Sequence, residues 1–125
     1  MYLFRYDMTL SGPILSVKFF HTEAGNEPVR DFLRDLPPED RKIIGTDIKE
    51  VQFGWPLGMP LVRKMEKDLW EVRSHIERRI FRVLFTMVGG QMVLLHAFIK
   101  KSQGTPHPNL EIARARKNQL GGVYE

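Results

Sequence analysis

Three cationic side chains are predicted to gather on one face of a β-sheet. Arg73 and Arg82 lie in two runs of alternating apolar and polar residues, and Lys101 follows a third run. Alternation of this kind sends every second side chain to the same face of a strand. Guanidinium and ammonium groups both bind phosphate oxygens, the former through a planar fork of N–H donors. The spacing therefore predicts a surface for a polyanion such as nucleic acid.

The turn that joins the last two runs fixes which residues share a face. Gly89-Gly90 is read as a two-residue hairpin turn, because glycine adopts the positive φ of such turns without steric cost. Counted from this turn, the register pairs Arg82 with Ala97 and Ile80 with Ile99. The cations then fall on the face with the smaller side chains, which we expect to be open to solvent. The bulkier face is the expected core and carries Phe81, Val83, Phe85, Met87, Met92, Leu94, His96 and Phe98.

Other polar residues of the chain are candidates for chemistry or for binding. Lys100 adds charge beside Lys101, and Glu71 either acts as a base or orients Arg73. His96 falls on the expected core face, so a packed, hydrogen-bonded histidine is the main interpretation and catalysis is the alternative. The cations expected on the solvated or RNA-facing surface are Arg63, Lys64, Arg78, Arg79, Arg114, Arg116 and Lys117.

Length and composition indicate one globular domain over residues 1–125. The chain has 125 residues and 42% hydrophobic content, enough to bury a core. Its formal net charge of +4 favours nucleic acid or an acidic partner. The cations are interleaved with apolar residues, which distinguishes them from a basic tail.

The sequence gives no sign of a metal, a cofactor or a membrane. It has no cysteine, which excludes disulfides and thiolate metal sites, and its histidines show no spacing typical of metal ligands. No apolar run reaches the roughly 20 residues of a membrane-spanning helix. Residues 1–10 are too polar for a secretory signal. We therefore expect a cytoplasmic protein with no metal, no cofactor and no membrane partner.

The elements that position these residues are predicted in the order strand, two helices, four strands and a short helix. An αα-hairpin with Pro37-Pro38 between its helices is expected to cover one sheet face. The last helix is predicted over residues 110–120, with Ile112 and Ala113 inward, and residues 1–12 form either an extra strand or a flexible extension. The predicted fold class is α+β, with an antiparallel sheet of four to five strands that is mixed at one edge.

Several motifs, taken in order, resemble one family. They are LWEVRS, RRIFRVLF, LLHAFIKKSQ with a following TP, LEIARAR, and the opening VKFFHTEAGNEPVRDFLRDLP. Together they resemble the phage Gp49-like, HigB-type branch of the RelE/ParE toxin superfamily over about residues 15–118. The resemblance implies a RelE-like fold and a type II toxin that cleaves mRNA in the ribosomal A site. It also implies a HigA-type helix-turn-helix antitoxin as the partner. In such a pair only the antitoxin would contact operator DNA directly.

Three residues carry over from the family pattern. Arg82 falls on the arginine of its RxxY/F strand motif, Lys101 on the basic residue after the last strand, and Arg73 on the cation that ends the preceding strand. Many RelE-type proteins also use a tyrosine near the C-terminus, and Tyr124 is not assigned that role. On an open face, Arg82→Glu is expected to abolish toxicity and leave the fold intact.

Two other functions stay open at this point. One is a ParE-like toxin that inhibits DNA gyrase by contact, without catalysis. The other is a nucleic-acid-binding phage accessory domain without toxicity. Metal-free RNA cleavage requires a base for the 2′-hydroxyl, cations for the charge on phosphorus and an acid for the leaving oxygen. The predicted cationic face favours the nuclease.

Overall fold

The computed structural model describes residues 14–100 and 106–124 of the chain. Its elements are β1 (Ser16–Phe19), α1 (Pro28–Arg34), α2 (Pro38–Gly54), β2 (Val62–Glu66), β3 (Leu69–Ile76), β4 (Arg79–Val88), β5 (Gln91–Lys100) and α3 (His107–Tyr124). The predicted order of elements is confirmed. Lys101 and residues 1–12 lie outside the described residues.

The strands form one mixed sheet in the order β1-β5-β4-β3-β2. β1 runs parallel to β5 at one edge, and the other neighbours are antiparallel. The predicted α+β class, including the mixed edge, is therefore confirmed. No helix in the part of the chain that the structure describes is long and apolar enough to span a membrane.

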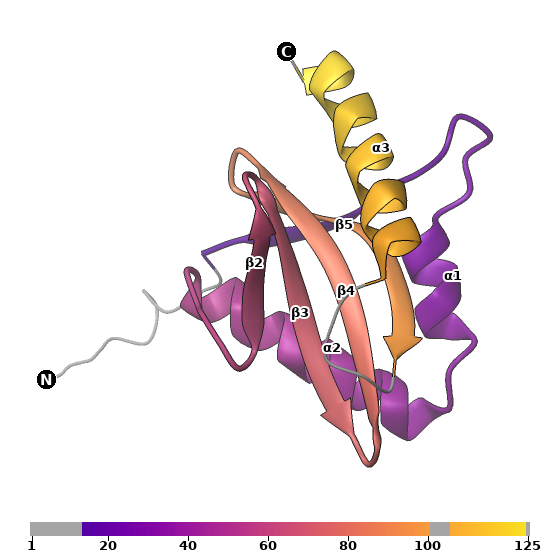
Figure 1. Ribbon diagram of the computed structural model, residues 1–125, viewed down its shortest axis with the longest axis vertical. Coiled ribbons are helices and arrows are strands. Elements are labelled where there is room, and N and C mark those ends of the chain that lie inside the picture. Colours follow the sequence, from indigo (N-terminus) through magenta and orange to yellow (C-terminus); the bar gives the residue numbers. More distant parts are fainter. Residues whose placement is uncertain (1–13, 101–105, 125) are drawn as a thin grey trace, which may run out of the picture.

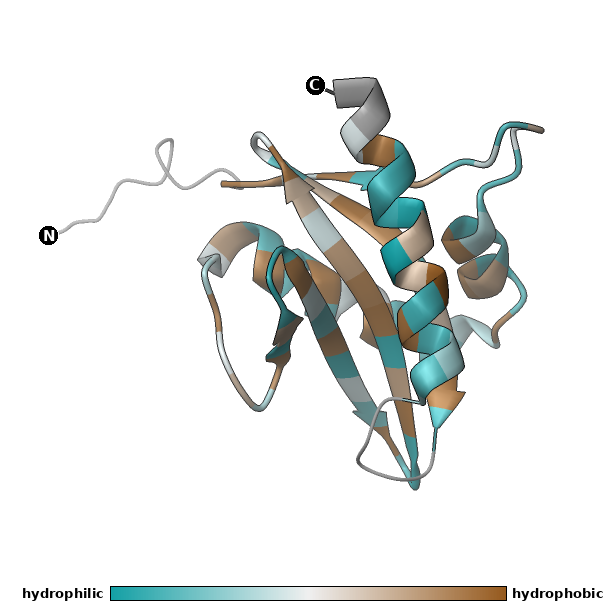
Figure 2. Cartoon of the chain, turned by 45° about the horizontal axis from the view of Figure 1, so that its top comes forward, coloured by the Kyte–Doolittle hydropathy of each residue, from teal (hydrophilic) through white to brown (hydrophobic). Residues whose placement is uncertain are grey.

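Helices cover both faces of the sheet. In Figure 1, α2 runs behind the strands and α3 crosses in front of them, with α1 beside β5. A larger apolar core fills the space between the sheet and α1 and α2, and a second core lies beneath α3. Figure 2 shows hydrophobic residues along the strands between these helices. The expectation of one buried and one open sheet face is therefore wrong.

The helices follow from apolar spacing and proline placement. Ile44, Ile48 and Val51 form the buried stripe of α2, and Pro38 stands in its first turn, where a missing N–H costs nothing. In α3, Ala113 is fully buried as expected, whereas Ile112 is 37% exposed and contradicts the prediction. α3 also begins at His107, earlier than the predicted 110.

A β-bulge changes the register between β4 and β5. The turn is as predicted, with Val88 opposite Gln91 and Gly89 at a φ of +60°. Phe85 still pairs with Leu94, but Leu84 pairs with His96, so the register skips Leu95. An extra residue of this kind reverses the alternation in the rest of the strand.

Two predicted pairs are therefore wrong. Arg82 lies opposite Phe98 rather than Ala97, and Ile80 lies opposite Lys100 rather than Ile99. After the bulge, the side chains of β5 lie on the opposite faces from those predicted. Ala97 joins the core beneath α1 and α2, and Phe98 packs against the core beneath α3. His96 lies opposite Leu84 and thus on the α3 side, not on the predicted core face.

Candidate functional site

Polar residues from four strands meet on the α3 side of the sheet. Side chains directly opposite each other on antiparallel strands lie on the same face, about 5 Å apart at Cβ. The register gives two adjacent rows across the sheet, which are Arg63–Glu71–Leu84–His96 and Arg73–Arg82–Phe98. The predicted grouping of Arg73 with Arg82 on one face is therefore confirmed. We call Arg63, Glu71, Arg73 and Arg82 the arginine cluster.

Glu71 lies at the centre of the arginine cluster. Its Oε1 atom is 3.3 Å from Nη1 of Arg82 and 3.7 Å from Nε of Arg73. The side chains of Glu71 and Arg82 are 0% exposed and that of Arg73 is 4% exposed. An open cationic face without acids is therefore the wrong description, because these side chains are enclosed and a carboxylate lies among them. Buried charges require partners, and Glu71 is one of them.

The arginine cluster keeps an excess of positive charge within the described part of the chain. Burial lowers the pKa of Arg82, and the neighbouring charges of Arg73 and Arg63 lower it further, whereas Glu71 acts in the opposite direction. A guanidinium nevertheless stays protonated in proteins at neutral pH. Among the described residues, the guanidinium groups of Arg63, Arg73 and Arg82 therefore lie beside the carboxylate of Glu71.

His96 lies beside the arginine cluster with its ring held on two sides. Its Nε2 atom is 2.7 Å from Oδ1 of Asn109, and its ring stacks on Phe98 with centroids 5.7 Å apart. Burial lowers the pKa of His96, and the nearby charge of Arg116 adds to that effect, while the bond to Asn109 opposes it. The imidazole is therefore neutral at neutral pH, the state in which histidine accepts a proton.

The less buried members of this face lie at its edges. Arg63 on β2 and Lys100 at the end of β5 are both half-buried. Lys100 lies opposite Ile80, so its side chain is on the α3 side together with that of Arg82. Lys100 is thus a lysine that the structure places on this face beside Arg82, and Lys101, predicted there, is outside the described residues.

The family model for phage derived protein Gp49-like matches residues 31–118. The chain belongs to this family. It is a HigB-like family of the RelE/ParE toxin superfamily. No curated protein matches the chain significantly. Membership in the Gp49-like family suggests a RelE/HigB-type toxin and implies a cognate antitoxin, and it is consistent with endoribonuclease activity.

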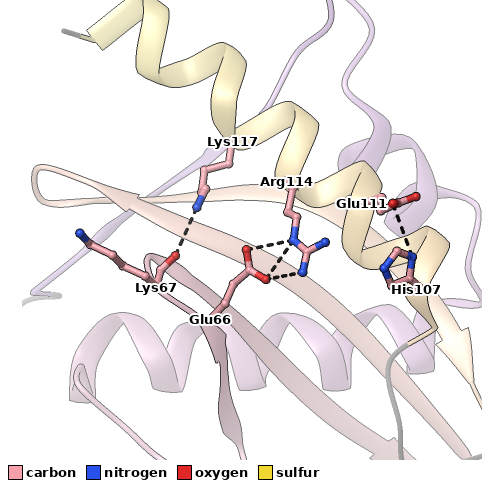
Figure 3. A network of polar contacts seen from close by, with 6 residues as sticks. All are labelled: Glu66, Lys67, His107, Glu111, Arg114 and Lys117. Atoms are coloured by element: carbon pink, nitrogen blue, oxygen red, sulfur yellow. Dashed lines mark hydrogen bonds and ion pairs between the residues drawn. The ribbon is translucent and has the colours of Figure 1, made fainter.

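Three cations of this Gp49-like chain that were predicted to face RNA have partners on other elements. Arg114 donates two hydrogen bonds to the Glu66 carboxylate, from Nη2 at 2.7 Å and from Nε at 2.9 Å. Lys117 donates to the carbonyl oxygen of Lys67. Figure 3 shows both contacts. These contacts join α3 to the end of β2 and the turn after it. Arg79 pairs with Asp40 of α2 at 3.2 Å.

Two predicted RNA-facing cations are well exposed but lie away from the arginine cluster. Arg78 is in the turn between β3 and β4. Lys64 lies opposite Trp70, which packs on the core beneath α1 and α2, so Lys64 is on the other face from its neighbour Arg63. Contact of either residue with RNA stays a prediction.

Sequence reasoning missed the part that α3 of this Gp49-like chain takes in the site. Asn109 precedes the predicted start of the last helix at residue 110, yet it is in the first turn of α3 and bonds His96. Arg116 was expected to face RNA, yet its Nη1 atom donates to the carbonyl of Leu95 at 2.8 Å. One signal was available, because Asn109, Ala113 and Arg116 follow at helical spacing and so share one face of α3.

Proposed function

We propose that this chain is the toxin of a type II toxin–antitoxin pair and that it stops translation by cleaving mRNA on the ribosome. Family membership supports the toxin class. The observation that carries the nuclease proposal is the arginine cluster, in which Arg63, Arg73 and Arg82 surround Glu71. An excess of positive charge attracts the RNA backbone and favours the additional negative charge that develops on phosphorus during cleavage.

In this proposal the buried cations and the half-buried cations of this face have different roles. Arg82 and Arg73 are enclosed and raise the positive potential from beneath the surface, where the low dielectric weakens screening. Arg63 and Lys100, which are half-buried at the edges, make the direct phosphate contacts. Lys100 or Lys101 then provides the proton for the departing 5′-oxygen, since an ammonium group can act as a general acid.

His96 is proposed as the base for the 2′-hydroxyl. It is neutral at neutral pH and lies diagonally across from Arg82 in the register. Diagonal neighbours on antiparallel strands are about 7–8 Å apart, within reach of long side chains and of a phosphate between them. Glu71 is proposed to orient Arg73 and Arg82 rather than to take the proton, because it contacts both and has no exposed surface.

The proposed partners follow from the same reasoning. Substrate held in the ribosomal A site is positioned partly by the ribosome, so the protein itself requires no deep substrate pocket. The proposed antitoxin is a HigA-type helix-turn-helix protein, and operator DNA is contacted only through it. Arg78 and Lys64, which are both exposed, are the proposed ribosome-facing cations. The proposed compartment is the cytoplasm, where ribosomes and mRNA are present.

One observation favours a second candidate, a ParE-like gyrase inhibitor. Arg73 and Arg82 are buried and engaged with Glu71, and a toxin that acts by contact needs no phosphate near them. In that case the arginine cluster has only a structural role in the sheet.

An induction experiment separates the candidates. The chain is expressed from a tight promoter in a bacterium while growth, pulse-labelled translation, mRNA integrity and plasmid supercoiling are followed. Arrested translation with mRNA cut within codons, reproduced by purified protein only when ribosomes are present, is the expected result. Intact mRNA with altered supercoiling would replace the proposal by the gyrase candidate. Normal growth would reject both and favour a non-toxic nucleic-acid-binding domain.

A matched pair of lysine variants tests the location of the site. Lys100→Met removes the charge on the α3 side, and Lys49→Met removes an exposed lysine on α2, in the opposite layer. Loss of one contact to a phosphate is expected to lower cleavage by roughly tenfold or more. Lys49→Met is expected to cleave like the parent chain. Equal activity of the two variants would exclude Lys100 from the site.

A further inference from the structure

The bulge in β5 places two consecutive side chains on one face. Leu95 belongs to the apolar core beneath α3, and His96, which follows it, lies opposite Leu84 of that same core. In a regular strand one of these two would point to the other face. The position of His96 beside the arginine cluster therefore depends on the bulge at Leu95.

Arg116 binds the bulge at the residue that the register skips. Its Nη1 atom donates to the carbonyl oxygen of Leu95 at 2.8 Å. Its guanidinium also lies over the ring of Phe20, 5.6 Å from the centroid. A planar guanidinium held between a ring and a carbonyl has little freedom, so Arg116 fixes the distance between α3 and this part of β5.

The same face of α3 orients the imidazole. Asn109 precedes Arg116 by two helical turns, and its Oδ1 atom lies 2.7 Å from Nε2 of His96. With an amide oxygen as the acceptor, Nε2 carries the proton and Nδ1 is left as the acceptor. The stacked ring of Phe98 limits rotation of the imidazole. α3 thus contacts both the bulge and the ring of His96.

We propose that Arg116 is a positioning residue which, together with Asn109, holds His96 on the side of the arginine cluster through the carbonyl of Leu95. This assignment rests on the proposed function of His96 as a base. It replaces the RNA-facing role that the sequence predicted for Arg116. Within residues 14–100 and 106–124, the charged groups on this face near His96 are Arg116 from α3 and Arg82 from β4, with Glu71 two strands away in the same row.

Arg116→Met is the main test, with Arg114→Met as its matched control. Both variants remove one arginine from α3, but Arg114 anchors the helix to Glu66 of β2 and not to β5. The titration and tautomer of the His96 ring are followed by NMR on the full chain, together with amide exchange along β5. The kcat and KM for ribosome-dependent mRNA cleavage are measured in parallel.

Arg116→Met is expected to raise the titration midpoint of His96, change its tautomer ratio and speed amide exchange at Leu95 and His96. The kcat is expected to fall by about tenfold or more with little change in KM, because the base is misplaced. Arg116→Lys, which keeps the charge but not the fork, is expected to be intermediate. Arg114→Met is expected to leave His96 unchanged.

Two results would overturn the inference. The first is a His96 ring with the parental titration and tautomer in Arg116→Met. The second is an equal disturbance of His96 in Arg114→Met, which would show only that α3 had loosened. If Arg116→Met misfolds, Asn109→Ala provides the second test, since it leaves the bulge contact in place and should alter the tautomer alone.

The same measurements distinguish failure of the proposed nuclease function from failure of the positioning inference. If the parent chain cleaves no mRNA with ribosomes present, yet Arg116→Met shifts the His96 titration, the nuclease is rejected and the positioning of His96 by Arg116 stands. If the parent chain cleaves mRNA and Arg116→Met matches it with an undisturbed His96, the positioning inference fails and the nuclease stands.

Discussion

Glu71 and Arg82 form an ion pair that the fold encloses completely. Both side chains are 0% exposed, and Oε1 of Glu71 lies 3.3 Å from Nη1 of Arg82. Taking two charges out of water is costly, so such a pair adds little net stability, but removal of one partner is strongly destabilising. The pair therefore governs how substitutions in the arginine cluster will behave.

Glu71→Gln is expected to destabilise the chain severely. It leaves Arg82 and Arg73 buried without the carboxylate that contacts both of them, and the loss of one partner of a buried pair costs about 3–5 kcal/mol. Urea unfolding followed by circular dichroism measures the change. A loss below about 1 kcal/mol, the range of exposed ion pairs, would show that this carboxylate is not needed to hold the cluster.

Arg82→Glu is expected to unfold the chain rather than to abolish toxicity in a folded protein. It places a second carboxylate against Glu71 in an enclosed site, where like charges repel strongly. This reverses the expectation that an open face would tolerate the change. Arg82→Lys keeps the charge and is expected to fold with reduced toxicity, because an ammonium group does not reproduce the planar guanidinium that contacts Glu71. Thermal unfolding and growth after induction, measured on both variants, check this pair of outcomes.

Arg63→Met and Lys64→Met are expected to differ although the residues are neighbours. Arg63 is on the α3 side opposite Glu71, and Lys64 is on the other face opposite Trp70. Loss of Arg63 is expected to weaken RNA binding and to reduce its salt dependence by about one phosphate contact. Fluorescence anisotropy with a short single-stranded RNA at several salt concentrations gives the measurement. Equal effects of the two changes on RNA binding would show that RNA does not bind preferentially to the α3 side of the sheet.

The stability of the chain is expected to fall as the pH drops below the ordinary histidine pKa of 6.5, through His96. Burial and Arg116 lower the pKa of His96 in the folded chain, so the unfolded chain binds the proton more readily. The stabilising effect is complete above 6.5 and is lost as the pH falls toward the lowered value. Comparison with His96→Asn at pH 7 and pH 5 isolates this effect, since the other histidines are present in both proteins. Parallel pH profiles would contradict it.

The Glu66–Arg114 pair is expected to contribute a second pH-dependent effect in a lower range. The hydrogen bonds from Arg114 lower the pKa of Glu66 below its ordinary value of 4.5. The contribution of the pair is therefore present above 4.5 and is lost as the pH falls through the lowered pKa. Glu66→Gln is expected to lower the Tm at pH 7 and to match the parent chain at strongly acidic pH. Because the pair is partly exposed, high salt should also reduce the difference in Tm between Glu66→Gln and the parent chain at pH 7.

Much of the fold could be predicted because local signals were strong. Alternating residues marked the strands, Gly89 and Gly90 marked the turn, and the spacing of Ile44, Ile48 and Val51 marked the buried side of α2. The grouping of Arg73 with Arg82 also followed, because both lie on strands joined by a short turn.

The second half of β5 could not be predicted, because no glycine or proline marks the bulge at Leu95. The contacts that accompany it come from Arg116 and Asn109, which lie 21 and 13 residues away from their partners in the chain. The burial of the arginine cluster was missed for a related reason. Helical spacing showed that Ala113 faces inward, but not which sheet face α3 would cover.

The bulge also bears on how the length of this hairpin can change. Since Leu95 has no counterpart on β4, its removal leaves every other pairing between the two strands as it stands, from the glycine turn to Lys100. A shortening by one residue between His96 and Lys100 would turn one of these two side chains to the opposite face. Among homologous chains, a gap of one residue is therefore tolerable at this position and disruptive between His96 and Lys100.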